Sequence, residues 1–326
     1  MPDAPPGPAG RYDGLAYNDP PRGGSRYASE GPSAPTADAL LVPLHRDRCL
    51  TRGGQPLLPA ASPGGRAVLA AAHQLVLLSA DRSGTGDRSG TDGEDGTDGG
   101  AGGEVWGADL SHLPEETAAR LAQDAEPIGV RGLFGTLPGA RAGLLARASG
   151  LLHWHRTQRY CGTCGAATRS RPDGSYRECT GPGCGKELYP RLEPAVIVLV
   201  EAPGPDPACL LARHRGAGPD HYSLVAGFVE VGDSLEGAVR RELAEEAGVT
   251  VDRVVYQASQ AWPFPAGLMV GFRAVARTRD TAVDHDELLE ARWFSRAEVR
   301  RRALEGPGLG PADSIGHALL TAWLAE

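Results

Sequence analysis

One segment, GFVEVGDSLEGAVRRELAEEAGV at residues 227–249, constrains this chain more than any other, because it predicts a helix that aims carboxylates inward. At about 100° per residue, Leu235 and Val239 define an apolar stripe. Glu242 and Glu246 fall in the same sector, one or two turns further along. A helix that begins by turning apolar residues toward a core therefore ends by turning acids toward it.

The outer face of this helix is already occupied, by Glu236 and Arg240 as an i, i+4 pair and by Ala244. The inward carboxylates, with Glu245 at their edge, would repel one another and lose solvation unless a positive group lay among them. A divalent cation with oxygen ligands, such as Mg²⁺, is the partner that this pattern favours. The loop 227–232 before the helix could admit a polyphosphate beside that cation. An ordinary solvated acidic face is the alternative.

The same segment resembles the Nudix box, G-x5-E-x7-R-E-U-x-E-E-x-G-U with U an aliphatic residue. The fixed positions that match are Gly227, Arg241, Glu242, Leu243, Glu245, Glu246, Gly248 and Val249. The departure is Asp233, which stands where the pattern has Glu. Asp233 is one methylene shorter than Glu, and it has a second interpretation as the N-cap of a capping box with Glu236.

The resemblance implies a metal-dependent hydrolase of nucleoside diphosphates linked to another moiety. It implies that Glu242, Glu245 and Glu246 hold catalytic Mg²⁺ or Mn²⁺ ions, with Ala226 offering a backbone carbonyl and Arg241 orienting the glutamates. The metal would neutralise the pyrophosphate and lower the pKa of an attacking water. Glu246 or Glu245 would help to deprotonate that water.

Four of the six cysteines are clustered, in CGTCGAATRSRPDGSYRECTGPGCG. Cys161 and Cys164 form a C-x2-C pair, and Cys179 and Cys184 form a C-x4-C pair fourteen residues later. Two such pairs, with glycines to supply the turns, predict a tetrahedral zinc site. Because four thiolates leave no open position, we expect a structural zinc; a metal-free thiol cluster is the alternative.

The segment SQAWPFPAG, residues 259–267, resembles S-Q-P-W-P-F-P-x-S, the sequence that marks the NADH pyrophosphatases among Nudix enzymes. Ala261 and Gly267 differ from that pattern. The prolines stiffen the loop, so that its rings and backbone could hold a base or nicotinamide; a plain proline-rich turn is the alternative. The substrate-binding residues implied here are Gln260, Ala261, Trp262, Pro263, Phe264, Pro265, Ala266 and Gly267.

Further residues correspond to substrate or metal positions of the same family. Tyr189 and Phe228 stand where family members stack the nicotinamide, and Glu287 matches a further acidic ligand, with a plain surface glutamate as its alternative. Arg131 matches a substrate contact after a one-residue gap. Gly316 stands at another position that contacts substrate in the family, where the usual residue is Ala.

The chain divides by composition. Residues 1–38 predict a disordered tail, and the repetitive, acidic stretch 81–104 predicts a disordered insertion. Between and after them we expect a mixed α+β N-terminal domain over 39–158, in which ALLVPL, RAVLAAAHQLVLLSA and VWGADL are strands and a helix begins at Ala140. A zinc ribbon over 159–190 follows. An α/β domain over 191–326, by resemblance a Nudix α/β/α sandwich, completes the chain.

Composition excludes several other classes. The insertion carries seven acids against two bases, which leaves −3 of the net charge of −8 for the rest of the chain. A body so nearly neutral is not a generic nucleic-acid binder. No run of about 18 apolar residues and no basic start followed by an apolar stretch is seen, so we expect neither a membrane span nor a secretory signal. Clustered, metal-like cysteines favour a reducing compartment, so we expect a cytoplasmic protein.

The leading hypothesis is metal-dependent hydrolysis of NAD(H) to NMN(H) and AMP, with removal of NAD caps from RNA as the same reaction on a longer substrate. The family resemblance also implies a homodimer. One alternative is a catalytically weak Nudix and zinc-ribbon sensor of nucleotides or RNA. Another is an enzyme for ADP-ribose or a dinucleoside polyphosphate. The segment HWHRTQRY, 153–160, could contact RNA, although the polar end of a helix explains it better.

Overall fold

The structure, a computed structural model, describes residues 33–80, 103–306 and 308–326 and divides them into two compact units. The predicted tail and insertion lie almost entirely outside the described residues. At their described ends, the Glu104 carboxylate accepts hydrogen bonds from the Thr36 N–H at 3.2 Å and from Trp106 Nε1 at 3.1 Å.

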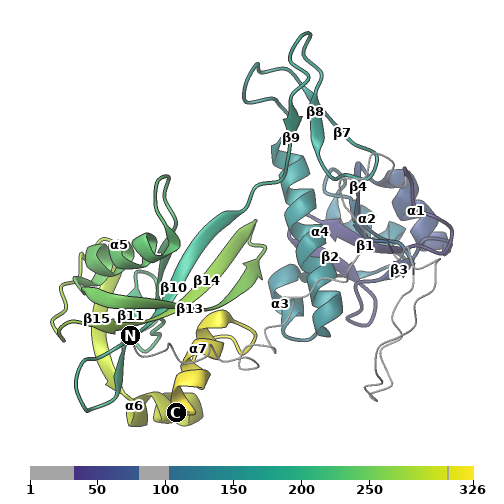
Figure 1. Cartoon of the computed structure of the whole chain (residues 1–326). Coiled ribbons are helices and arrows are strands. Elements are labelled where there is room, and N and C mark those ends of the chain that lie inside the picture. The colour runs from purple at the N-terminus through teal and green to yellow at the C-terminus, as the bar shows by residue number, and fades with distance from the viewer. Residues whose placement is uncertain (1–32, 81–102, 307) are drawn as a thin grey trace, which may run out of the picture. The chain divides into compact units, whose positions relative to one another are not determined.

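The first unit, Leu192–Trp262 with Gly267–Glu326, is built on a six-stranded sheet of order β13-β14-β10-β11-β15, in which β12 also pairs with β10 (Figure 1). β10 and β14 are parallel and the other neighbours are antiparallel. The strands are β10 (Glu193–Glu201), β11 (Ala208–His214), β12 (Val225–Phe228), β13 (Val251–Trp262), β14 (Gly267–Ala276) and β15 (Leu288–Ser295).

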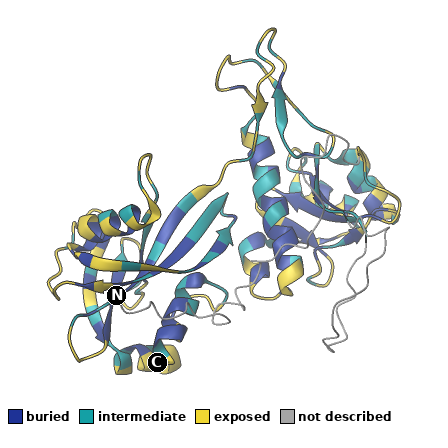
Figure 2. Cartoon of the chain, viewed as in Figure 1, coloured by how far each residue is buried: buried dark blue, intermediate teal, exposed yellow. Residues whose placement is uncertain are grey.

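Helices cover both faces of this sheet. α5 (Leu235–Ala247) packs on one face, and α6 (Arg296–Glu305) and α7 (Ile315–Leu324) pack on the other. The side chains of β10 alternate accordingly, because Val196 and Val198 join the core beneath α5 while Leu199 joins the core beneath α7. Most residues of β10 and β11 are buried, whereas much of β13 is exposed or half-buried (Figure 2). The predicted α/β/α arrangement is thus confirmed.

The second unit contains an α/β region followed by a small three-stranded sheet. Its main sheet has the order β4-β5-β1-β2-β6, with β3 paired to β1, and α4 packs against β4, β5 and β1. Its elements are β1 (Leu40–His45), β2 (Arg48–Thr51), β3 (Leu58–Pro59), α1 (Pro63–Ala71), β4 (Gln74–Ser79), β5 (Val105–Asp109), α2 (Glu115–Leu121), β6 (Glu126–Gly129), α3 (Val130–Phe134) and α4 (Gly139–Thr157).

Part of the strand prediction for this unit is wrong. The run RAVLAA of the segment predicted as a strand lies in α1, and only QLVLLS forms a strand, β4. Ser62 caps α1, because its side chain accepts a hydrogen bond from the Gly65 N–H, and Pro63 occupies the first helical position. Helix α6, which was not predicted, begins with a capping box between Ser295 and Glu298. Among the described residues, no helix is both long and apolar enough to cross a membrane.

Candidate functional site

Helix α5 carries the predicted acidic residues, and its ends are defined by local signals. The side chain of Ser234 accepts the Gly237 N–H at 3.0 Å as the N-cap, and Gly248 ends the helix with φ of 66°. The N-cap interpretation of Asp233 is therefore wrong. Leu235, expected in the apolar stripe, is exposed in the first turn, and the buried residues of α5 begin with Ala238 and Val239.

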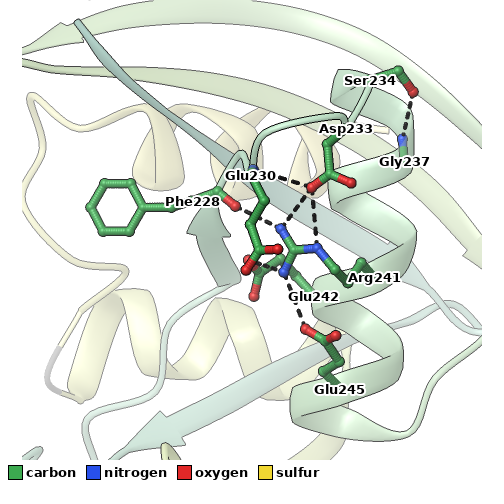
Figure 3. A network of polar contacts seen from close by, with 8 residues as sticks. All are labelled: Phe228, Glu230, Asp233, Ser234, Gly237, Arg241, Glu242 and Glu245. Atoms are coloured by element: carbon green, nitrogen blue, oxygen red, sulfur yellow. Dashed lines mark hydrogen bonds and ion pairs between the residues drawn. The ribbon is translucent and has the colours of Figure 1, made fainter.

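Arg241 binds four groups at the start of the acidic site (Figure 3). Its guanidinium donates to the carboxylates of Asp233 at 2.9 Å, Glu242 at 2.9 Å and Glu245 at 3.1 Å, and to the Phe228 carbonyl at 2.8 Å. The Arg241 hydrogen bond and the Glu230 N–H lower the pKa of Asp233. Only the planar fork of an arginine serves so many acceptors, so this contact ties the loop before α5 to the helix.

Glu242 and Glu246 are the two buried carboxylates of α5, with exposures of 8% and 4%. Glu245 differs, because its side chain is 61% exposed and it pairs with Arg241. Gly227, on β12, lies directly against the Glu242 carboxylate, where a Cβ would come within 2.0 Å of the carboxylate carbon. The fixed glycine of the motif therefore makes room for an acid.

Burial, reinforced by the negative charges of Glu242 and Glu287, raises the pKa of Glu246 to about 8. Its buried Oε2 atom finds no hydrogen-bond partner among the described residues. Glu287 lies on the exposed loop before β15, where the Asp284 carboxylate accepts the backbone N–H groups of residues 286 and 287 at 3.1 and 3.2 Å. Two buried acids with an unpartnered oxygen form a donor set that fits a divalent cation.

The predicted substrate loop is the turn between β13 and β14. Trp262 pairs with Gly267 across the hairpin, so Pro263–Ala266 form the turn and Ala261 lies in β13. Gly267 has no room for a side chain, because a Cβ would lie 2.9 Å from the Trp262 carbonyl oxygen. The turn residues group with the second unit, where the Phe264 ring centroid lies 5.5 Å from that of Phe134.

Gln260 does not reach this loop. Its side chain is fully buried, its Nε2 donates to the Asp313 carbonyl at 2.7 Å, and its Oε1 accepts the Ile315 N–H at 2.8 Å. These two hydrogen bonds hold the start of α7, and the substrate contact expected of Gln260 stays a prediction. Gly316 follows in the same helix, and a Cβ there would lie 3.3 Å from Ile197 Cδ1.

The remaining predicted substrate residues lie in both units. Phe228 is 63% exposed at the end of β12, next to the Arg241 network. In the second unit, Tyr189 is 43% exposed and stacks on Tyr176 with ring centroids 5.1 Å apart. Arg131 lies in α3, with its guanidinium 5.7 Å from the Phe264 ring centroid.

The four clustered cysteines converge as predicted. Their Sγ atoms all lie within 4.8 Å of one another, the only such set of three or more candidate ligands among the described residues. The sheet of β7 (Thr168–Ser170), β8 (Arg177–Cys179) and β9 (Glu187–Leu188) brings the two pairs together. Gly165 and Gly185 follow their cysteines with φ of 75° and 53°, which confirms the predicted turns.

The thiol chemistry of this cluster fits a metal. Hydrogen bonds from the backbone at Thr163 and Cys164 lower the pKa of Cys161 to about 6. Gly181 lies beside the cluster, where a Cβ would come within 3.1 Å of Cys164 Sγ and 3.3 Å of Cys179 Sγ. A closed set of four converging sulfur ligands suits a structural Zn²⁺.

Sequence reasoning missed Asp284, which shapes the loop that carries Glu287. Its role follows from an Asx turn, for which an aspartate two residues before a backbone N–H is a recognised signal. The segment DHDELLE contains that pattern, but so do many acidic loops.

Comparisons with known proteins identify two matching family models. The NUDIX domain model matches residues 191–311, and the NADH pyrophosphatase zinc ribbon domain model matches residues 156–189. The chain is thus similar to proteins that combine these two domains in this order.

Three curated relatives illustrate the similarity. "NAD-capped RNA hydrolase NudC" of Deinococcus radiodurans is 39% identical over 62% of this chain and 69% of its own length. "Nudix hydrolase 19, chloroplastic" of Arabidopsis thaliana is 44% identical over 48% of this chain and 37% of its own length. "NAD-capped RNA hydrolase NUDT12" of Homo sapiens is 38% identical over 56% of this chain and 42% of its own length. The match thus spans less than half of the plant and human proteins.

Proposed function

This chain belongs to the Nudix hydrolases that carry an NADH pyrophosphatase zinc ribbon, and from that premise we propose that it hydrolyses the diphosphate bond of NAD(H) to NMN(H) and AMP. The observation that carries the proposal is the buried pair Glu242 and Glu246, for which the backbone at Gly227 makes room. Burying two like charges is unfavourable unless a cation compensates them. A protein that only binds nucleotides has no need for two buried carboxylates, so their unfavourable burial favours the enzyme.

We assign Glu242, Glu245, Glu246, Glu287 and the Ala226 carbonyl as the groups that hold Mg²⁺ or Mn²⁺. When bound, the cation neutralises the diphosphate and makes water more acidic. Arg241 positions Glu242 and Glu245 and fixes the preceding loop through the Phe228 carbonyl. Glu246 accepts the proton of the attacking water, because its Oε2 is buried and unpartnered among the described residues, whereas Glu245 is exposed and paired.

The exposed rings of Tyr189 and Phe228 and the turn Pro263–Ala266 are the proposed nicotinamide and base contacts. An NAD cap on RNA contains the same diphosphate bond, so cap removal is the same reaction with a longer leaving group. The names of the bacterial and human relatives support this extension. We further propose one structural Zn²⁺ on Cys161, Cys164, Cys179 and Cys184.

We propose the following organisation for the whole chain. Residues 39–158 form the N-terminal domain, 159–190 the zinc ribbon and 191–326 the Nudix hydrolase domain, and the chain acts as a cytoplasmic homodimer. The two matching family models, over residues 156–189 and 191–311, support the zinc ribbon and the start of the Nudix domain. Sedimentation of the purified chain tests the dimer.

Product analysis tests the reaction. Purified protein is incubated with NADH and Mg²⁺ or Mn²⁺, beside Glu246→Gln and the matched control Glu236→Gln, an exposed glutamate of the same helix. We expect AMP and NMNH from the unaltered chain and from the control, and neither product from Glu246→Gln. Intact NADH under both metals, with hydrolysis of ADP-ribose instead, would replace the proposed substrate.

A further inference from the structure

His214 ends strand β11 on the face of the sheet that α5 covers. Alternation along β11 places Leu210 and Ala212 in the core beneath α5, and Cys209 and Leu211 in the core beneath α7. His214 continues the first series, because side chains two residues apart in a strand share a face. The half-buried imidazole therefore lies on the side of the sheet to which Glu242 and Glu246 point.

The pairing of β11 with β15 leads to the same placement independently. His214 is opposite Leu288, and directly opposed residues in an antiparallel pair project to the same face. Leu288 is fully buried in the core beneath α5. The register shift between Arg213 and His214 leaves the face of His214 unchanged, because the additional residue, Leu289, belongs to β15.

Glu287 is fixed beside the end of β11, next to His214. It immediately precedes Leu288, its carbonyl accepts the Arg215 N–H at 2.9 Å, and its own N–H donates to Asp284. Burial lowers the pKa of His214, and the negative charge of Glu287 opposes that shift. The same charge contributes to the raised pKa of Glu246. The Glu287 carboxylate therefore interacts electrostatically with both His214 and Glu246.

We propose that His214 is a positioning residue of the acidic site, whose imidazole N–H donates to the Glu287 carboxylate and holds it toward Glu246. Glu287 needs such a partner, because it is a long, exposed side chain repelled by the acids that it must join. A neutral imidazole N–H supplies a directed hydrogen bond to a carboxylate without placing a second positive charge beside the cation. The inference rests on the proposed metal site, but not on the identity of the substrate.

Direct Mn²⁺ binding to the full chain, measured by titration calorimetry, tests this role. His214→Phe keeps a ring of similar size and removes the N–H, whereas His214→Gln keeps a side-chain N–H donor. We expect His214→Phe to weaken Mn²⁺ binding about 10-fold, the usual effect of losing a group that hydrogen-bonds a metal ligand, and His214→Gln to restore most of it. Arg213→Ala is the matched control, since Arg213 points to the opposite face toward Glu290 and should not change binding.

A double-mutant cycle identifies the residue through which His214 acts. In a Glu287→Gln background, His214→Phe should cause no further loss of Mn²⁺ affinity, because the group that it positions is already altered. Additive losses in the double mutant, or unchanged Mn²⁺ affinity in His214→Phe, would overturn the proposal. Absence of NADH turnover together with the expected Mn²⁺ pattern would instead reject the proposed substrate and leave the role of His214 standing.

Discussion

The backbone of Gly227 lies so close to the carboxylate of Glu242 that a side chain at this position would collide with it. A Cβ built on Gly227 would lie 2.0 Å from the Glu242 carboxylate carbon and 2.2 Å from both of its oxygens. The same carboxylate accepts a hydrogen bond from Arg241 at 2.9 Å. The glycine and the glutamate of the motif thus correspond to one steric relationship between a strand and a helix.

Gly227→Ala should therefore displace Glu242 while leaving the fold intact. We expect activity toward NADH to fall about 100-fold, because a displacement of about 1 Å at a catalytic group has effects of this size. Steady-state kinetics and Mn²⁺ titration check the loss. Gly139→Ala, at a helical glycine whose Cβ would meet nothing within 4 Å, is the matched control and should behave like the unaltered chain.

Replacing Arg241 should separate the role of its charge from that of its shape. Arg241→Lys keeps the charge but cannot reach four acceptors at once, so we expect the free energy of unfolding to fall by about 2 kcal/mol, since hydrogen bonds to charged groups carry that order of energy. The exposed Glu245 contact contributes least. Urea denaturation measures the change, and Arg253→Lys, at an exposed arginine of β13, should show none.

The acidic helix could be predicted because its signal is local: the helical spacing of residues 235–246 places apolar and acidic side chains on one face. Spacing alone placed Glu242 and Glu246 inward, and both are buried. It failed at the start of the helix, where Leu235 is exposed and Ser234 is the N-cap in place of Asp233. Helical periodicity says nothing about where a helix leaves its sheet, and capping depends on which of two adjacent side chains the loop turns inward.

Features that depend on distant parts of the chain could not be predicted. Gln260 matched a substrate motif, but its amide binds backbone groups of residues 313 and 315, more than fifty residues away. The apolar run after Ser62 looked like a strand because periodicity cannot distinguish a short buried helix from a buried strand. The cap at Ser62 followed by Pro63 was the local signal that could have decided it.

His155 should make stability depend on pH. It lies in α4, buried, where Nε2–H donates to the Gly174 carbonyl at 2.9 Å and Nδ1 accepts from Arg177 at 3.0 Å. Burial, as the largest cause, lowers its pKa to about 4. The unfolded chain therefore binds this proton first, so the stability that the neutral ring provides is complete above about pH 6.5 and falls as the pH drops toward 4.

Between pH 7.5 and pH 5 this single group should remove about 2 kcal/mol of unfolding free energy. Urea denaturation at both values measures the change. His155→Gln keeps a donor and an acceptor but cannot titrate, so its pH dependence should be shallower by that amount. An equal slope in the variant and the unaltered chain would contradict the assignment. The comparison of slopes removes the contribution of other titrating groups, including the raised pKa of Glu246.

The cysteine cluster predicts one Zn²⁺ per chain, bound by four of the six cysteines. Cys179→Ser should abolish zinc binding, because its thiolate is one of four that must converge, whereas Cys209→Ala, at a buried thiol of the β11 core, should retain full zinc content. Elemental analysis of the purified proteins measures the ratio.

Three-stranded sheets as short as β7-β8-β9 bury too little apolar surface to be stable alone, so a chelator that removes the metal should also unfold this segment. Hydrogen exchange would report that loss at residues 161–188. Unchanged protection there after complete zinc removal would show that packing, and not the metal, holds the ribbon together.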